Sequence, residues 1–450
     1  MKIKKTILIV CLFILAAACI YGYGKWRQFN SVPDTRLCAD CAAPENYPKT
    51  GIHYFKVPID HKDLDRGYWQ DYYLTSPSFK KGNIPVFVFF DGQQEMTSPF
   101  RDWGREKAVL GDMPCVVVGT RGSPPNIFPE VFDSDKSVNF KEALKLYSSW
   151  QQIEDIELAR KDMVAKGLIG PEGKIMLYGG SGGGILEQQY LDRYGQNVIR
   201  ALMESTGAPD LAEKNGLPYS RLFSEYSPEA AKLYANKFSK HIDPSLAFML
   251  FKLEQSAGGQ AVPGKEIKLI RGKKSLYLPG KWEYFKNLFR LPLNYSIVKA
   301  IIMSPQELMC RVRIYELCYG ISDYLMKPGH RTQLLYDWAG DTLSDFIKAE
   351  RRGIIRKPKM IIDRAAFSGE VLVFSGIRDF DFNQEITKLL ADSYKNSVTA
   401  AFDDGHTHAG TALDGNSDYY RSLRAAFFMY GLKSDEFMKY YKDKRQLIRE

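Results

Sequence analysis

Short apolar runs recur along the chain, several of them ending at a glycine, and longer stretches of helical periodicity separate them. Such runs are typical of buried strands, and the stretch 148–168, with apolar residues near a 3.6-residue period, predicts a helix. Strands that alternate with helices predict an α/β protein with a mostly parallel sheet that is buried on both faces. The predicted strands lie in 72–75, 85–92, 114–122, 174–180, 197–205, 370–380 and 397–410.

Residues 210–365 lack this alternation and contain three stretches of helical periodicity, 227–242, 244–259 and 305–320. We expect them to form a helical cap inserted into the sheet domain, where it would cover the functional site and limit the size of the ligands admitted. The remaining predicted units are an N-terminal segment 1–18, two parts of the sheet domain, 45–209 and 366–435, and a basic tail, 436–450.

The segment 174–191 carries the most specific chemical pattern, G-x-S-x-G, filled by Gly179, Ser181 and Gly183. An apolar run precedes it and an amphipathic stretch follows it, so the pattern predicts a nucleophile elbow, in which a serine sits at a sharp strand-to-helix turn. Ser181 is therefore the candidate nucleophile. The amide of Gly182, at the start of the helix, would donate to a developing oxyanion. The alternative is a glycine-rich turn before an ordinary helix.

An acid and a histidine follow the serine in the order that a serine triad of this type requires. Asp379 comes just after the strand in 370–380, with Asp381 as the reserve candidate, and His406 follows the turn after the last predicted strand. Imidazole would take the proton of Ser181 while the carboxylate fixes its tautomer. His408 is the alternative base. All three predicted residues fall after strands, where open α/β sheets place their sites.

Composition restricts the class of protein. The chain has 450 residues, 45% of them hydrophobic and 26% charged, as expected for a globular protein that can bury a full core. The net charge of +9 includes three lysines of the N-terminal segment and is too mild to predict nucleic-acid binding. The basic stretch 265–290 is interpreted as a solvated face of the cap, with contact to an anionic surface as the alternative. No cofactor is expected.

The N-terminus resembles an export signal. A basic start and an apolar run lead to three alanines before Cys19, as in a secretory signal peptide. Cys19 also follows the pattern of a bacterial lipobox, although alanine stands where leucine is usual. An uncleaved membrane anchor is the alternative. In each case we expect the protein to be exported, to the periplasm or the cell surface. A membrane attachment would be through Cys19 or through the N-terminal apolar segment.

Seven cysteines fit an oxidising compartment. The nearest pairs are Cys38 with Cys41 and Cys310 with Cys318, which leaves Cys115 free in a buried strand. The first pair could also be half of a metal site or a redox motif, but the chain has no second C-x-x-C, so no metal is expected.

Several blocks of the chain resemble α/β-hydrolase serine peptidases, with the nearest resemblance to the prolyl iminopeptidase and tripeptidyl aminopeptidase family. The block 54–79 is also similar to prolyl carboxypeptidases. The resemblance implies an α/β-hydrolase fold with an inserted helical cap, and it hardly covers residues 210–365. The similar blocks are 85–94, 116–125, 153–164, 177–184, 188–198 and 371–379.

The resemblance implies Ser181 as nucleophile, Asp379 as orienting acid and His406 as base. It also implies an oxyanion hole made by the amide of Gly182 and one amide of the turn after the strand in 85–92, either Gly92 or Gln93. The chain departs from the family there, because Asp91-Gly92-Gln93-Gln94 replaces the usual His-Gly-Gly-Pro-Gly type turn. Separately, Arg121 matches an arginine of the family and could be part of the catalytic site, with a surface or structural ion pair as the alternative interpretation.

The sequence thus predicts an exported serine exopeptidase, of aminopeptidase type, that cleaves short peptides through an acyl-enzyme. An aminopeptidase must compensate the α-ammonium of its substrate with a carboxylate. Glu204, at the end of the strand in 197–205, is the candidate, with a surface acid or a salt-bridge partner of the cap as the alternative. A carboxypeptidase would need a cation instead. The other classes left open are an esterase or other acyl hydrolase and a non-catalytic surface-binding protein with the same fold.

Overall fold

A computed structural model describes most of the chain. The described residues are 50–90, 97–123, 126–238, 243–256, 262–274, 308–326, 332–376, 381–402 and 417–443, together with residues 305 and 379 and scattered positions between 12 and 48.

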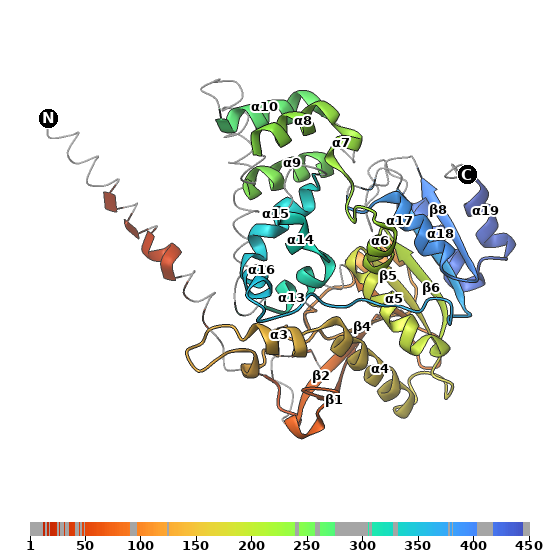
Figure 1. Ribbon diagram of the computed structural model, residues 1–450. Coiled ribbons are helices and arrows are strands. Elements are labelled where there is room, and N and C mark those ends of the chain that lie inside the picture. Colours follow the sequence, from red (N-terminus) through yellow and green to blue (C-terminus); the bar gives the residue numbers. More distant parts are fainter. Residues whose placement is uncertain are drawn as a thin grey trace.

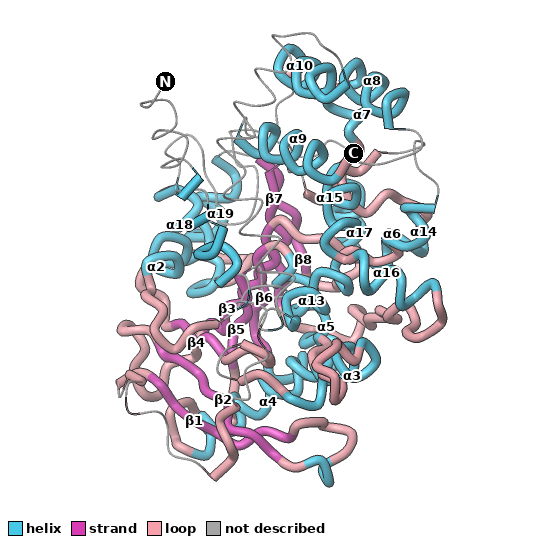
Figure 2. The backbone as a smooth tube through the Cα atoms, turned by 90° about the vertical axis from the view of Figure 1, so that its left-hand side faces the viewer, coloured by secondary structure: helices cyan, strands magenta, loops and turns pink. Residues whose placement is uncertain are grey.

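One sheet of eight strands forms the centre of the molecule, in the order β1-β2-β4-β3-β5-β6-β7-β8 (Figures 1 and 2). β2 pairs antiparallel with both β1 and β4, and all the other pairs are parallel. The mostly parallel sheet is therefore confirmed. β1 is the strand that the apolar pattern did not predict. The strands are β1 (Ile52–Pro58), β2 (Tyr68–Thr75), β3 (Val86–Phe90), β4 (Cys115–Val118), β5 (Ile175–Gly180), β6 (Val198–Glu204), β7 (Glu370–Gly376) and β8 (Ser397–Phe402).

Helices cover both faces of the sheet, which explains why the central strands β3, β4 and β5 lack charged residues. In β3, Phe87 and Phe89 belong to the core shared with α4 (Ser149–Ala165) and α5 (Gly182–Tyr194). The alternate residues Val86 and Val88 belong to a second core, shared with α2 (Gly104–Leu110), α18 (Ser417–Tyr430) and α19 (Asp435–Asp443). The two-residue period of a strand thus distributes one apolar run between two cores. The shorter elements α3 (Phe140–Leu146) and α17 (Gln384–Asp392) complete this part.

Between β6 and β7 the described chain contains helices and no strand, as the sequence predicted (Figure 1). We call these the cap helices. Their boundaries as a domain stay a prediction. They are α6 (Pro209–Asn215), α7 (Phe223–Tyr226), α8 (Pro228–Phe238), α9 (Pro244–Ser256), α10 (Pro263–Lys274), α13 (Leu308–Leu317), α14 (Ile321–Met326), α15 (Leu334–Thr342) and α16 (Ser344–Arg351).

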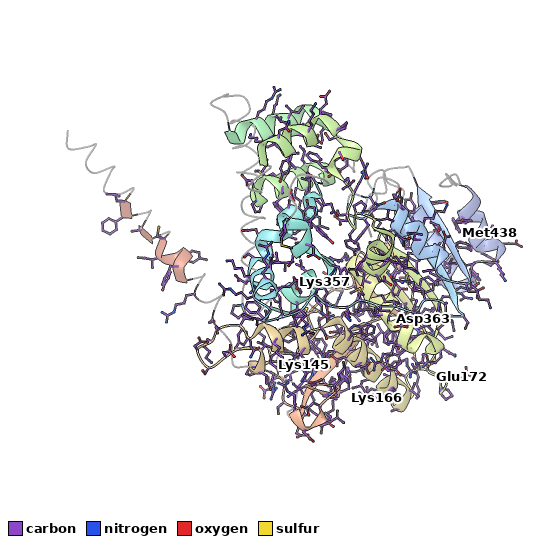
Figure 3. All side chains as sticks on the ribbon, viewed as in Figure 1. Lys145, Lys166, Glu172, Lys357, Asp363 and Met438 are labelled. Atoms are coloured by element: carbon purple, nitrogen blue, oxygen red, sulfur yellow. The ribbon has the colours of Figure 1, made fainter. Side chains whose placement is uncertain are left out.

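Ion pairs fasten the chain where it returns from the cap helices to β7. Lys357 pairs with Glu213 of α6 at 2.8 Å, and the amide of Asp363 donates to Asp192 at 3.1 Å (Figure 3). Arg364 then makes a bidentate pair with Asp210, at 2.8 and 2.7 Å. These polar contacts hold the segment 357–364, which leads from the cap helices into β7, against α5 and α6.

The cysteines differ in part from their predicted pairing. Cys38 is disulfide-bonded, and Cys41 lies outside the described residues. Cys115 is a free buried thiol, as predicted. The pairing of Cys310 with Cys318 is wrong, because neither cysteine forms a disulfide. Cys310 lies in α13 and Cys318 directly follows its end, so eight residues at 1.5 Å per residue separate them by about 12 Å. A disulfide requires Cα atoms within about 7 Å.

Within the described ranges, no helix is both long enough and apolar enough to cross a bilayer.

Candidate active site

Ser181 lies at the turn between β5 and α5 and has φ 54° and ψ −128°, a conformation that residues with a side chain rarely adopt. Such strain costs about 1–3 kcal/mol and persists only where the surroundings enforce it. The side chain makes no hydrogen bond that caps α5, although serine is a favoured capping residue. The turn therefore has the backbone of a nucleophile elbow, with a hydroxyl that the helix does not use.

The pattern glycines are required by close packing around this turn. A Cβ at Gly183 would collide with the backbone carbonyl of Phe89 at the end of β3. A Cβ at Gly179 would collide with the carboxyl group of Glu187 and would lie 2.6 Å from the Cα of Gly184. The first turn of α5 is therefore pressed against the ends of β3 and β5. This contact is the physical reason for G-x-S-x-G here, because only glycine fits at the two flanking positions.

The predicted acid lies at the same edge of the sheet. Asp379 follows β7 and is 1% exposed. Its Oδ1 accepts hydrogen bonds from the amides of Asp381, at 2.8 Å, and Phe382, at 3.3 Å. Backbone amides that donate to a carboxylate oxygen fix its orientation. The reserve candidate Asp381 thus supports Asp379 through its amide.

Backbone hydrogen bonds connect the ends of the three central strands. The amide of Ser181 donates to the carbonyl of Glu204 at 2.9 Å, and the amide of Ser205 donates to the carbonyl of Phe374 at 2.7 Å. Ser205 itself has φ 47°, a second strained residue directly beside the elbow, which the sequence pattern did not reveal. With strands about 4.8 Å apart, β5 and β7 bring Ser181 and Asp379 to one edge, separated by the width of β6.

The remaining predicted site residues divide into two groups. His406, its alternative His408 and the oxyanion candidates Gly92 and Gln93 lie outside the described residues. Gly182 is described and is the first residue of α5. Its amide belongs to the first helical turn, whose amides have no acceptor within the helix. Its role as an oxyanion donor stays a prediction.

Glu204 is placed differently from the prediction. Its carboxylate is fully buried and makes a bidentate pair with Arg424 of α18, at 2.6 and 2.8 Å. The hydroxyl of Tyr178 donates to it at 2.7 Å. Both oxygens are engaged, on the face of the sheet that α18 covers, so we assign Glu204 to an internal ion pair. The sequence could not reveal a partner 220 positions away.

Arg121 is likewise a structural residue. It is fully buried, and its guanidinium makes a bidentate pair with Asp155 of α4. The same group donates to the carbonyls of Pro58 at 2.6 Å, Ile59 at 2.7 Å and Leu146 at 3.1 Å. These contacts join the end of β1 to α4. The structural ion pair was the alternative reading, and it is the one observed.

Carboxylates also gather where the cap helices meet the segment after β7. Glu254 of α9 is 2% exposed, and burial raises its pKa well above the usual range, against the opposing effects of Tyr226 and Arg221. Its Oε1 lies 4.0 Å from Arg221 and has no hydrogen-bond partner within the described chain. Asp381 is close enough to raise the pKa of Glu254 further. Nothing in the sequence distinguished Glu254, because its neighbours come from distant segments.

Among the described residues, no group of three or more His, Cys, Asp and Glu side chains is arranged to hold a metal ion.

The order of the strands, the helices on both faces and the strained serine between β5 and α5 define an α/β-hydrolase fold. The fold predicted from the sequence is therefore confirmed. Comparison by sequence finds no match, neither among protein-family models nor among curated proteins.

Solved structures with a similar fold include a serine hydrolase from Cycloclasticus zankles, with 14% identity, a TM-score of 0.37, and coverage of 84% of this chain and 98% of that one. A putative lipase from Acinetobacter baumannii has 13% identity and a TM-score of 0.38, and the match covers 84% of this chain and 91% of that one. An α/β-fold hydrolase from Bacillus anthracis has 15% identity and a TM-score of 0.35, and the match covers 79% of this chain and 92% of that one. At these scores the likeness carries no argument about activity, and the fold class rests on the sheet itself.

Proposed function

We propose that the protein is an exported serine exopeptidase of aminopeptidase type, which cleaves short peptides through an acyl-enzyme. The observation that carries the hydrolase assignment is the strained Ser181, held beside β6 at the same sheet edge as Asp379. In the reaction, Oγ of Ser181 attacks the scissile carbonyl and its proton passes to His406. The base then returns the proton to the leaving amine, and water hydrolyses the ester that remains.

The preference for free N-termini is supported by Glu254 rather than by Glu204. A buried carboxyl that is neutral without a partner can become ionised when a cation binds beside it. Glu254 has one oxygen without a hydrogen-bond partner in the described chain and lies near Asp381, which itself contacts Asp379 through its amide. A substrate ammonium at this position would compensate two neighbouring acids. Arg221 at 4.0 Å limits the excess negative charge.

The resemblance of the sequence blocks to prolyl iminopeptidases and tripeptidyl aminopeptidases supports the same choice. Export is supported by the disulfide of Cys38, since disulfides persist in oxidising compartments. The apolar residues Leu12, Phe13 and Ile20 are 55%, 74% and 72% exposed, as expected of a segment that is removed or inserted into a membrane. Acyl chains on Cys19 would anchor the domain, and stable anchoring needs more than one chain.

Matched peptide reporters test the proposal. Peptides with a free N-terminus should be cleaved, N-acetylated peptides should lose nearly all turnover, and C-terminal amidation should have little effect. Glu254→Gln should raise KM for free-amine peptides while the labelling of Ser181 by a fluorophosphonate persists. Equal cleavage of free and acetylated peptides would contradict the aminopeptidase type. Turnover of short esters without any peptide cleavage would instead identify an esterase.

A further inference from the structure

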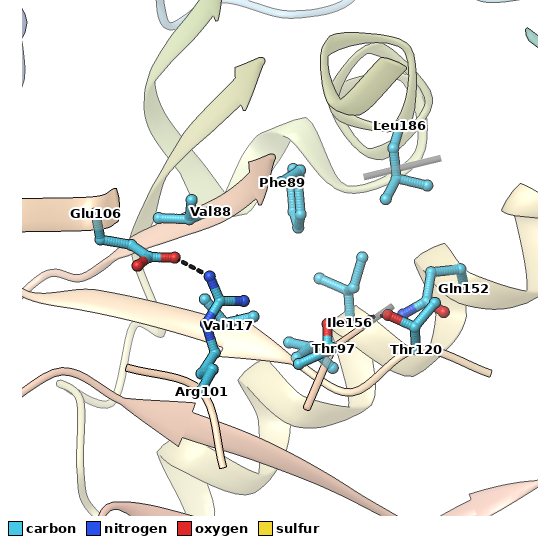
Figure 4. Close-up of a pocket in the computed structure, with 11 residues that line it drawn as sticks. Val88, Phe89, Thr97, Arg101, Glu106, Val117, Thr120, Gln152, Ile156 and Leu186 are labelled. Carbon is cyan, nitrogen blue, oxygen red and sulfur yellow. Dashed lines mark hydrogen bonds and ion pairs between the residues drawn. The ribbon is translucent and has the colours of Figure 1, made fainter. Parts of the chain in front are cut away.

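A small cavity lies at the carboxyl ends of β3 and β4, between α2 on one side and α4 and α5 on the other (Figure 4). Its volume is about 30 Å³, enough for one or two groups of the size of a water molecule. Part of the wall is apolar and includes Phe89 and Leu186. The polar part consists of Thr97, Arg101, Glu106, Thr120 and Gln152.

The cavity adjoins the elbow. Phe89 is paired with Gly179 of β5, and its carbonyl is the group that a side chain at Gly183 would meet. Leu186 lies on α5, a little more than one turn after Ser181. Because β3 and β5 are neighbours about 4.8 Å apart, a substrate held at Ser181 lies within reach of this cavity.

An ion pair in its wall is incompletely satisfied. Glu106 is 2% exposed and pairs with Nη2 of Arg101 through Oε1. Its Oε2 and the Nε of Arg101 are both buried and have no hydrogen-bond partner in the described part of the chain. Buried polar atoms are normally paired, so this acceptor and this donor need an explanation. Burial raises the pKa of Glu106, even though Arg101 opposes the shift.

The other polar groups in the wall already have partners. The hydroxyls of Thr97 and Thr120 share a hydrogen bond of 3.0 Å. Gln152 donates to the carbonyl of Gly119 at 2.9 Å and accepts from the amide of Arg121 at 3.2 Å. Among the side chains that line the cavity, the open hydrogen-bonding capacity is therefore concentrated on Arg101 and Glu106.

The charge balance selects the chemistry that fits. Arg101 and Glu106 neutralise one another, so a cation or an anion in the cavity would add a buried charge without compensation. A neutral group that both donates and accepts, such as a hydroxyl or a carboxamide, can bond to Oε2 and Nε together. A purely apolar group of the same shape would leave both atoms unpaired.

We propose that this cavity is a specificity subsite for a short substrate side chain that ends in a hydroxyl or a carboxamide. The inference rests on the proposed hydrolase function, since it assumes that the substrate reacts at Ser181. It does not depend on whether the scissile bond is an amide or an ester, and the preference can be measured with either kind of reporter.

The test compares isosteric side chains at each of the first three positions of peptide and ester reporters. Threonine should exceed valine, and asparagine should exceed leucine, by about 10- to 100-fold in kcat/KM at one position. Aspartate and lysine should be poor there. Equal rates within both pairs at every position, with Ser181 still labelled by a fluorophosphonate, would overturn the subsite and leave the hydrolase assignment intact. Failure of Ser181 to react with the probe would overturn the proposed function itself.

Two variants locate the preference. Glu106→Gln should reduce the threonine-to-valine ratio toward one with little change in the labelling of Ser181. The matched control is Glu142→Gln, which removes a carboxylate from the pair that Glu142 makes with Arg66 at 2.7 Å, away from the cavity. Val118 of β4 also belongs to the apolar wall. If Glu106→Gln does not fold, Val118→Leu tests the same point by filling the cavity while keeping the ion pair. An unchanged ratio in a folded cavity variant would overturn the proposal, as would a structure in which the cavity holds only water while threonine reporters bind elsewhere.

Discussion

The amide of Ser181 donates to the backbone carbonyl of Glu204 at 2.9 Å, while the side chain of Glu204 pairs with Arg424 of α18. One residue thus fixes the backbone of the predicted nucleophile and also joins the sheet to α18. β6 therefore holds the elbow through its backbone, while the side chain at the same position holds α18.

Two replacements of Ser181 distinguish the backbone strain at this residue from the role of its hydroxyl. Both Ser181→Ala and Ser181→Gly should lose turnover and fluorophosphonate labelling. Alanine keeps the strain of φ 54°, whereas glycine adopts this conformation at little cost, so the glycine variant should be more stable by about 1 kcal/mol. Chemical denaturation of the two variants measures the difference. Equal stability would argue against a strained turn.

Gly183→Ala should destabilise the protein, because the new methyl group would collide with the carbonyl of Phe89. Overpacking of this kind costs about 1–3 kcal/mol, and activity should fall with it as the elbow shifts. Gly170→Ala is the matched control, since a Cβ there meets nothing within 4 Å. Thermal unfolding of both variants checks the prediction, which would fail if they melted together.

Glu204→Ala should leave Arg424 buried without its carboxylate, at a cost of about 3–5 kcal/mol. Activity per folded molecule should change little. The companion variant Arg424→Met should also destabilise the protein, because it leaves Glu204 unpaired. If Glu204→Ala instead folded normally and raised KM only for peptides with a free N-terminus, Glu204 would be a substrate-binding residue after all.

Asp337 of α15 should make stability depend on pH. Burial raises its pKa to about 6, with the hydroxyls of Tyr324 and Tyr234 opposing the shift. An acid whose folded-state pKa is raised contributes stability that is complete below its unfolded pKa and is lost as pH rises through the folded value. Unfolding free energy should therefore fall between about pH 4 and pH 6, by up to about 3 kcal/mol. Asp337→Asn should flatten that fall, and the exposed Asp323→Asn should not.

The sheet was predictable because most of its strands are apolar runs that alternate with helical stretches. β1 was missed because the run Ile52–Pro58 includes His53 and the exposed Lys56, and its first three residues are only half-buried. The elbow was predictable because Gly179, Ser181 and Gly183 are adjacent in the sequence. Features built from residues adjacent in the sequence, such as a strand or the elbow turn, can therefore be predicted from local patterns.

Contacts between distant segments could not be read in the same way. Glu204 was placed correctly at the end of a strand, but the strand period alone does not show which helix covers that face. Cys310 and Cys318 are close in sequence, and the helix that separates them sets their distance. Glu106 and Glu254 appeared ordinary because their significance comes from burial, which depends on the whole fold.

The position of the cap helices has a consequence for the timing of assembly. Ser181 is synthesised before the insertion and Asp379 about 200 residues later, since all the cap helices lie between β6 and β7. A nascent chain that ends within the insertion contains the elbow but lacks β7, β8 and the predicted acid. Under the proposed function, such a chain carries the strained serine without its acid and base, so we expect it to be inactive.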